Sequence, residues 1–403
     1  MGRKAGGWSA VLWRPQEKVN EMRNRGTRTR ASATKLALAV AVAAVVSALG
    51  LAACGGGSVG GGGNGEATVA KGGPVSGKLT ISNWPGYMDT GPNNTIAKFE
   101  DKTGVSVDYI EDVNENEGFF GKMQPQLEQG ESGGRSIFVV TDWMAKQMYD
   151  LDYLQKIDHS ALPTVFANIR PQLEDVSFDP GRKFSVPWVS GMGGLWVDTA
   201  KAPEIRSVND LFDPKYKGKV TMLAELRETV PLVMLAEGID PVEATNQDWL
   251  NAIDRIKGAA ESGQIRRFTG NDYTEDLTAG NIVAAIGWSG DASIIENPNA
   301  EWRMPTEGCS LWSDNMVIPV GAPNAGAAYG WMNFIYEPQV NAPLAEYITY
   351  IPPVEGVKEL VKPALANDPL VFPSPKFTRK CTDQDSPPDI EPVNEAWQEV
   401  ITG

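Results

Sequence analysis

Strand-like and helix-like segments alternate along most of this chain, and that alternation restricts the folds open to it. Residues 78–84 form a short apolar run, residues 93–104 follow helical periodicity up to Gly104, and residues 105–112 alternate apolar and polar side chains. A strand, a helix and a second strand in this order predict a βαβ unit, whose two strands are parallel. The sequence therefore predicts an α/β protein with a mostly parallel sheet.

The alternation continues through residues 118–154. We expect a helix over residues 118–130 with a bend at Pro125, then a buried strand over residues 136–142 and a further helix. Ligands of such sheets bind beyond the carboxyl ends of the strands. No Gly-rich nucleotide fingerprint follows the first strand, so a dinucleotide site is not supported and we expect no cofactor.

Two extended segments indicate where the chain passes between two lobes. Residues 183–200 are apolar, Gly-rich and flanked by strand residues, and residues 310–324 form a second stretch of this kind. Between them, a strand over residues 218–223, a helix over residues 224–238 and a buried strand within residues 281–295 predict a second α/β lobe.

The N-terminus has the layout of an export signal. A basic segment precedes an apolar run over residues 36–54, which ends in Leu-Ala-Ala-Cys. This ending resembles the bacterial lipobox, so we expect Cys54 to carry a lipid; a plain signal peptide with a chance cysteine is the alternative. We assign residues 1–53 to the signal peptide, with an over-extended start because Met22 can open a compact signal. The lipidated cysteine and a Gly-rich tether then occupy residues 54–77.

The charge balance excludes one class of partner. The chain has a formal net charge of −15, and residues 1–53 contain nine basic and two acidic residues, so the remainder carries −22. Such a balance argues against nucleic acid, which requires a basic face. It is compatible with a cationic ligand and equally with solubility outside the cell. No run past residue 54 is long and apolar enough to span a bilayer.

Cysteine and histidine usage bounds the chemistry. Beyond Cys54 the chain contains Cys309 and Cys381, and export into an oxidising space favours a disulfide between them over two buried free thiols. His159 is the one histidine, and no Cys/His cluster accompanies it. We therefore expect no metal site, and any histidine-dependent catalytic mechanism would rest on His159.

Aromatic and acidic residues gather at the predicted strand ends and turns. They are Trp84, Tyr87, Trp143, Glu225, Glu228, Trp288, Trp312, Asp314 and Tyr350. Each has an ordinary structural explanation when taken alone: an acid complements a helix N-terminus, a tryptophan fills a core, and an aspartate before a strand forms a turn.

As a set, these residues suit an amine. An aromatic face attracts a cation by about 0.5–2 kcal/mol, and a carboxylate–ammonium hydrogen bond adds about 1.5–3 kcal/mol. Aromatic walls also bury methylene groups at roughly 0.8 kcal/mol each. Rings with several carboxylates therefore fit a flexible apolar chain that bears amines. A sugar site would mix donors and acceptors, and a phosphate site would use Arg or backbone N–H groups.

Seven stretches, in order, resemble the extracytoplasmic spermidine/putrescine-binding proteins of ABC importers. They are ISNWPGYM, KFEDKTGVSV, DYLQKIDHSAL, FSVPWVSG, SVNDLFDPKYKGKVTML, IGWSGDA and LWSDNMVIP, and the resemblance covers about residues 78–380. It implies a two-lobed periplasmic-binding-protein fold with a two-strand hinge. Lobe one would comprise residues 78–190 and 315–358, and lobe two residues 191–314 and 359–403.

The resemblance also implies a function and a site. A monomer held outside the cell membrane (or in the periplasm) would capture polyamines between its lobes and deliver them to an ABC permease, without enzymatic activity. The family's ligand contacts map onto Trp84, Tyr87, Thr141, Trp143, Glu225, Glu228, Trp288, Trp312, Asp314 and Tyr350.

Some positions depart from the family pattern. Thr141 and Trp143 stand where the family has a Ser-x-Tyr pair, and Glu225 stands where it typically has Asp, which would shift the pocket by one methylene. A family Ser has no clean match near residues 269–271, and a family Gln near the C-terminus has none. The choice between putrescine and spermidine therefore stays open.

Two alternatives remain at this point. A binding protein of the same architecture could take a sugar, another organic cation or iron, although acids interleaved with tryptophans suit organic cations better than iron. A secreted hydrolase could use Glu225 and Asp314 as acid and base. Turnover of a glycan would support the hydrolase, and amine binding without turnover would count against it.

Overall fold

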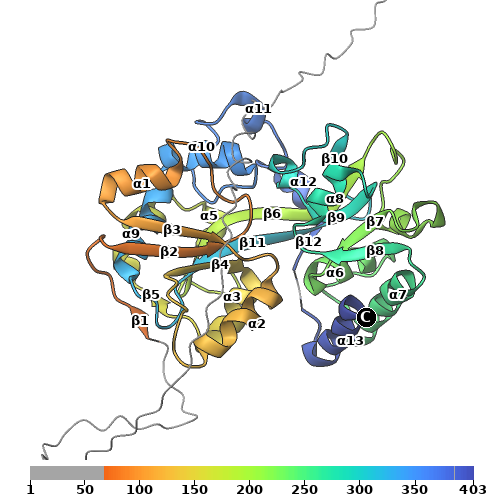
Figure 1. Cartoon of the computed structure of the whole chain (residues 1–403), viewed down its shortest axis with the longest axis horizontal. Helices are drawn as coiled ribbons and strands as arrows, with labels where there is room; N and C mark the ends of the chain where they lie inside the picture. Colours follow the sequence, from red (N-terminus) through yellow and green to blue (C-terminus); the bar gives the residue numbers. More distant parts are fainter. Residues whose placement is uncertain (1–67, 385) are drawn as a thin grey trace, which may run out of the picture. The chain divides into compact units, whose positions relative to one another are not determined.

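The structure, a computed structural model, describes residues 68–384 and 386–403. The predicted signal peptide, Cys54 and most of the predicted tether lie outside the described residues. A ten-stranded mixed sheet contains the path β3-β2-β4-β11-β6-β9-β7-β8, with β10 paired to β6 and β12 to β11. Figure 1 shows helices on both sides of these strands.

The first part of the sheet is parallel and follows the predicted βαβ order. It consists of β2 (Lys78–Asn83), α1 (Thr95–Thr103), β3 (Ser106–Glu111), α2 (Asn116–Leu127), β4 (Ile137–Thr141) and α3 (Asp142–Asp150). Helix α1 ends at Gly104, whose φ of 73° lies in the left-handed region and whose N–H donates to the Glu100 carbonyl. The prediction of a parallel α/β sheet is confirmed.

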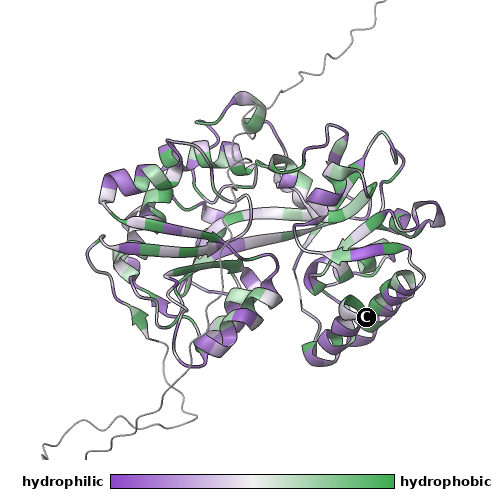
Figure 2. Cartoon of the chain, viewed as in Figure 1, coloured by the Kyte–Doolittle hydropathy of each residue, from purple (hydrophilic) through white to green (hydrophobic). Residues whose placement is uncertain are grey.

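The second part of the sheet is also parallel. Its elements are β7 (Val220–Leu223), α6 (Leu226–Ala236), α7 (Asn246–Glu261), β8 (Ile265–Thr269), α8 (Tyr273–Ala279) and β9 (Ala284–Trp288). Helix α7 buries Trp249, Ala252, Ile253, Ile256 and Ala259 on one face, as its amphipathic sequence predicts. Figure 2 shows hydrophobic residues along β4 and hydrophilic residues on outer turns of α2 and α7.

Two long antiparallel strands join the two parallel sets. Strand β6 (Ser185–Asp198) is buried along its whole length, and it pairs with β11 (Cys309–Val317) from Gly193↔Ser310 to Ser185↔Val317. On their other sides, β11 pairs with β4 and β6 pairs with β9, and both pairings are antiparallel. The predicted fold class, an α/β fold in which two mostly parallel sets of strands are joined by two strands, is therefore confirmed, and the joining strands merge both sets into one mixed sheet.

The remaining helices and strands cover this frame. They are β1 (Val69–Ala70), β5 (Lys156–Ile157), α4 (Pro163–Asn168), α5 (Pro171–Glu174), β10 (Ala300–Arg303), α9 (Ala325–Ile335), α10 (Pro338–Ile348), α11 (Pro363–Ala366), α12 (Pro375–Thr378), β12 (Cys381–Asp383) and α13 (Ile390–Thr402). The folded residues cluster as one compact unit, so the predicted lobe boundaries stay a prediction. None of the described helices is long and apolar enough to cross a membrane.

The two cysteines after Cys54 lie on neighbouring strands. Cys309 of β11 and Cys381 of β12 are register partners in a parallel pairing, with Cα atoms 4.3 Å apart, and a disulfide joins them. Cys309 is fully buried and Cys381 is half-buried. The sequence left a choice between a disulfide and two buried free thiols, and the structure contains the disulfide.

Candidate functional site

A pocket lies where the carboxyl ends of the parallel strands meet the two joining strands. Trp84 and Tyr87 follow β2, Thr141 ends β4 and Trp288 ends β9. The space between its lining atoms, part of it open to solvent, is about 310 Å³. Seven of the ten sequence-predicted residues line it, namely Trp84, Tyr87, Thr141, Glu225, Trp288, Trp312 and Asp314, together with Asn116, Asn271 and Gln384.

Asp314 is a buried carboxylate on β11, where the register with β6 shifts between Asp314 and Asn315. The Tyr87 hydroxyl donates to Asp314 Oδ2 at 2.9 Å, and the Thr141 hydroxyl donates to Oδ1 at 2.8 Å. These donors favour the charged form, but burial outweighs them and raises the pKa of Asp314 to about 7. Asp314 is thus held by neutral groups that supply no compensating charge.

Glu225 precedes the first residue of α6 and is contacted from the first part of the sheet. The backbone N–H of Asn116 donates to Glu225 Oε1 at 2.8 Å, and Asn116 Nδ2 donates to the same oxygen at 3.0 Å. Burial, reinforced by the charge of Glu115, raises the pKa of Glu225 to about 8. Asn116 Nδ2 also donates to the Thr141 hydroxyl at 2.8 Å, so the groups that hold Glu225 and Asp314 are linked.

Glu228 lies in the first turn of α6, fully buried and behind the pocket wall. The Ser310 hydroxyl donates to its Oε1 and Gln384 Nε2 donates to its Oε2. Burial raises the pKa of Glu228 to about 7. Strand β6 passes so closely that a Cβ on Gly193 would lie 1.4 Å from Glu228 Oε1, which explains a glycine at that position.

Aromatic rings form the rest of the wall and touch one another edge to face. Trp84 meets Trp288 with ring centroids 5.8 Å apart, and Tyr350 meets Tyr87 at 5.4 Å and Trp312 at 5.2 Å. All five rings are buried. Because each ring fixes its neighbours, the wall presents a preformed aromatic surface to a ligand.

Several polar atoms of the lining lack a partner. Within the described residues, the indole N–H groups of Trp84 and Trp312 and the amide oxygens of Asn271 and Gln384 make no hydrogen bond although they are buried. Unmet buried groups of this kind are costly unless a ligand or water satisfies them. The two amide oxygens are acceptors, so they add to the capacity of the carboxylates to receive N–H groups.

The chemistry of the lining suits a cation. Among the described residues that line the pocket, none is Lys or Arg, while Glu225 and Asp314 are both carboxylates. The described part of the chain also contains no group of three or more His, Cys, Asp or Glu residues that could hold a metal ion. Acids, aromatic faces and free acceptors thus surround a space without a balancing positive side chain.

Comparison with known proteins identifies the family. The model of the family "Bacterial extracellular solute-binding protein" matches residues 94–373. The chain belongs to this family. Members bind solutes outside the cell, so the protein is a binding protein, not an enzyme, and acts beyond the cytoplasm.

Similar proteins of this family have names that refer to polyamines. The spermidine/putrescine-binding periplasmic protein of Salmonella typhimurium is 25% identical over 327 residues, covering 80% of this chain and 91% of the relative. The putrescine-binding periplasmic protein PotF of Escherichia coli is 27% identical over 355 residues, covering 81% and 91%. The crystal structure of the spermidine/putrescine ABC transporter substrate-binding protein PotD from Streptococcus pneumoniae matches with a TM-score of 0.66 and 27% identity, covering 81% and 98%.

Three predicted ligand residues of this solute-binding protein do not line the pocket. Glu228 lies behind Gln384, and Tyr350 stands behind Tyr87 and Trp312. Trp143 lies outside the pocket lining, and the Arg227 guanidinium covers its ring at 3.9 Å from the ring centroid. Glu228 and Tyr350 therefore support the wall, whereas Trp143 pairs with a cation of the protein itself.

Asn116, Asn271 and Gln384 line the pocket but were not among the predicted residues. Asn116 is the first residue of α2, after a polar loop, and Asn271 follows β8. Both therefore lie in segments that follow strands, where ligands of such sheets bind. Gln384 follows β12, a strand with no clear pattern of its own. Asn271 lies in the segment where the family Ser had no match, and Gln384 lies in the C-terminal region where the family Gln had none.

A second buried acid supports the wall from behind. Asp291 accepts hydrogen bonds from the Tyr350 hydroxyl (2.8 Å), from Asn271 Nδ2 (3.2 Å) and from the Tyr273 hydroxyl. The Tyr273 hydroxyl also accepts from the backbone N–H of Trp288 at 2.9 Å. Asp291 thus holds Asn271 and Tyr350 directly, and it holds Trp288 through the Tyr273 hydroxyl.

Proposed function

We propose that this solute-binding protein captures polyamines of the putrescine and spermidine class in the pocket and delivers them to an ABC permease. The observation that carries the proposal is the pair of buried carboxylates, Glu225 and Asp314, in an aromatic pocket without a lysine or arginine among its described lining residues. The names of the polyamine-binding relatives support it.

The proposed mode of binding assigns each kind of group a task. A protonated amine takes Asp314 as its counter-ion, and the methylene chain lies against Trp84 and Trp312. Each desolvated cation–π contact contributes about 0.5–2 kcal/mol, and each carboxylate–ammonium bond about 1.5–3 kcal/mol. Terminal amines are received by Glu225 at one end and by the amide oxygen of Gln384 at the other, where Glu228 holds the Gln384 side chain from behind.

The proposed clamp uses groups from both parallel sets. Tyr87, Thr141 and Asn116 belong to the first set, and Glu225 and Glu228 to the second. The chain crosses between the sets on β6 and β11, which serve as the hinge of the proposed lobes at residues 78–190 with 315–358 and 191–314 with 359–403. Asn116 of the first set already donates to Glu225 of the second, so the closed clamp would hold the amine between acids and rings.

The proposed setting is the outer face of the cell membrane. The lipobox-like sequence supports attachment through a lipid on Cys54, and the following Gly-rich segment serves as a tether. The protein acts as a monomer that meets its permease at the membrane.

Isothermal titration calorimetry with putrescine, spermidine, spermine and glucose tests the proposal. We expect saturable binding of at least one polyamine with a Kd on the order of micromolar or tighter, and no heat from glucose. Binding of glucose, or no binding of any of the three amines, would show that the pocket serves another class of solute.

A further inference from the structure

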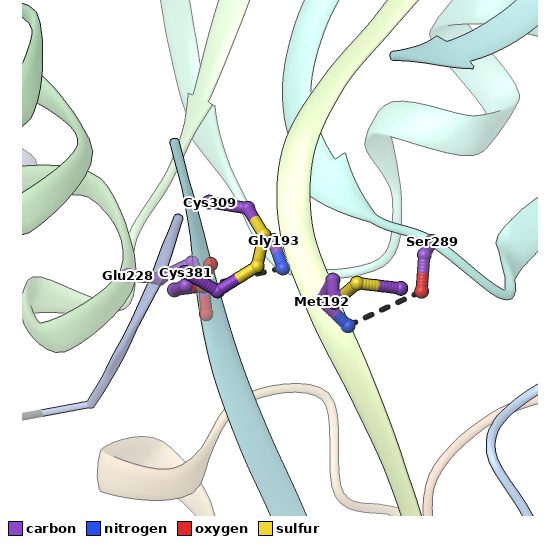
Figure 3. The surroundings of a disulfide bond; sticks show 7 residues. Met192, Gly193, Glu228, Ser289, Cys309 and Cys381 are labelled. Carbon is purple, nitrogen blue, oxygen red and sulfur yellow. Dashed lines mark hydrogen bonds between the residues drawn. A yellow bond between two sulfur atoms is a disulfide. The ribbon is translucent and has the colours of Figure 1, made fainter. Parts of the chain in front are cut away.

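The disulfide joins β11 to the short strand that leads to Gln384, one of the residues that line the pocket. Strand β12 pairs in parallel with β11, and the register partners are Cys309↔Cys381, Ser310↔Thr382 and Leu311↔Asp383. One edge of β11 is thus paired with β12 over residues 309–311 and with β4 from Asp314 onward. Figure 3 shows the disulfide with Glu228 and Gly193 around it.

Both oxygens of Glu228 are held by residues adjoining this disulfide. Ser310, which donates to Oε1, is the neighbour of Cys309 in β11. Gln384, which donates to Oε2, follows β12 and lies three residues after Cys381. Gln384 also lines the pocket, where its Oε1 has no hydrogen-bond partner within the described residues.

The strand that precedes Gln384 is short and partly exposed. Strand β12 has three residues, and Arg379, Lys380 and Asp383 around it are exposed. Further along the chain, Arg227 Nε donates to Ser386 Oγ at 3.0 Å. A strand this short contributes little stability by itself, so the covalent bond is the firmest attachment of Gln384 to β11.

We propose that the Cys309–Cys381 disulfide positions Gln384 in the ligand pocket, so that the affinity for polyamines depends on the oxidation state of this pair. The inference rests on the proposed function. Half-buried Cys381 is open to attack by a thiol, whereas Cys309 is shielded. A dithiol reductant supplies two electrons and two protons: the Cys309–Cys381 bond breaks, both sulfurs become thiols, and the dithiol closes to its own disulfide.

Release of β12 acts on the ligand through Glu228. Gln384 leaves the pocket, and Glu228 loses one of the donors that favour its charged form. Burial raises the pKa of Glu228, and bonds from Ser310, Gln384 and Trp288 oppose that rise. Without Gln384 the carboxyl of Glu228 therefore stays protonated to a higher pH and contributes less negative charge beside the pocket.

A two-by-two experiment tests this coupling. Spermidine affinity is measured by calorimetry for the wild type and Gln384→Ala, each oxidised and each reduced with dithiothreitol, at pH 6.5 and 8.5. Reduction should weaken wild-type binding about tenfold, the equivalent of one hydrogen bond to a charged group, with the larger loss at pH 6.5. Oxidised Gln384→Ala should show the same loss and pH profile, and reduction should change it by less than about twofold.

Two further variants complete the design. The pair Cys309→Ser and Cys381→Ser should reproduce the reduced wild type without any reductant, and circular dichroism reports whether each form stays folded. Gln129→Ala changes an exposed glutamine in the turn after α2 and should bind as the wild type does, oxidised or reduced.

The outcomes separate this inference from the proposed function. If oxidised wild type binds none of the amines, the proposed function fails and the inference fails with it. If it binds but reduction leaves its affinity unchanged, or weakens wild type and Gln384→Ala equally, only the inference is overturned. Wild-type affinity of oxidised Gln384→Ala would overturn the inference even if the reduced protein unfolds.

Discussion

Three carboxyl groups in or beside the pocket resist ionisation because they are buried. The pKa of Glu225 is raised to about 8, and those of Glu228 and Asp314 to about 7. Near neutral pH each exchanges a proton at little cost, so an arriving ammonium group can displace protons and stabilise the charged forms. The pocket is thus poised for a cation in a way that an exposed acidic surface is not.

At this scale, Asp314→Asn and Glu228→Gln should each weaken spermidine affinity at least about tenfold. Asp314→Asn removes a charge-assisted hydrogen bond to the amine, and Glu228→Gln removes the negative charge that holds Gln384 at the pocket wall. Both substitutions keep the shape of the side chain, so the fold should survive. Glu301→Gln, at an exposed position of β10, is the matched control. Calorimetry measures the change, and unchanged affinity in both variants would mean that the residue assignment is wrong.

The same carboxyls predict how stability depends on pH. Their pKa values are higher in the folded protein than the value of about 4 in an unfolded chain, so the folded form binds more protons. The stabilisation is complete below about pH 4 and is lost as the pH rises through 7 and 8. The free energy of unfolding should fall by at most about 1.4 kcal/mol per pH unit for each group.

Thermal unfolding between pH 5 and pH 8.5 checks this expectation. The melting temperature of the free protein should fall as the pH rises, and saturating spermidine should flatten or reverse the slope because it stabilises the charged carboxylates. A melting temperature that rises with pH in the free protein would contradict the pKa assignment.

At the scale of elements, closely approaching loops bring the two parallel sets together. Asn114 lies in the loop before α2, and Gly270 follows β8. A Cβ on Gly270 would lie 2.6 Å from the Asn114 carbonyl oxygen and 2.4 Å from its Nδ2. Asn114 is two residues before Asn116, which donates two hydrogen bonds to Glu225. The spacing between the two loops therefore affects the end of the pocket at which Glu225 lies.

Gly270→Ala should therefore weaken polyamine affinity by about threefold or more, because the added methyl group wedges the loops apart. Gly258→Ala is the control, since a Cβ there meets no atom within 4 Å and the residue lies inside α7. It should keep the affinity and raise the melting temperature slightly. Equal affinities of the two variants, measured by calorimetry, would show that this loop contact does not govern binding.

Local patterns were enough to predict most elements, and the exceptions have physical reasons. Gly104 predicts the end of helix α1, and β4 is a continuous apolar run, so the sequence predicts both elements. Strand β8 places Arg266 and Arg267 side by side, both exposed, and so shows no alternation. Gln384 lines the pocket just after β12, which pairs with β11 and is joined to it by a disulfide, a contact that no local pattern contains.

On the scale of the whole molecule, two strands carry the connection between the parallel sets. The buried strand β6 and its partner β11 run from one set into the other, and Asp314 lies on β11 where the register shifts. A ligand bound to Asp314 is therefore held at the crossing itself. Such a position suits a binding protein whose proposed lobes close over the solute, because the counter-ion stays fixed while both walls approach.

Anchoring is the last property argued at this scale, and it concerns Cys54, outside the described residues. A binding protein serves its permease best when it stays at the membrane, and a lipid on Cys54 would hold it there through the Gly-rich tether. Cys54→Ser should move the protein from the membrane fraction to the soluble fraction without changing its spermidine affinity, while Ser58→Ala in the tether should leave it at the membrane. Detergent phase separation followed by calorimetry measures both properties, and a wild type that partitions into the aqueous phase would exclude the lipid anchor.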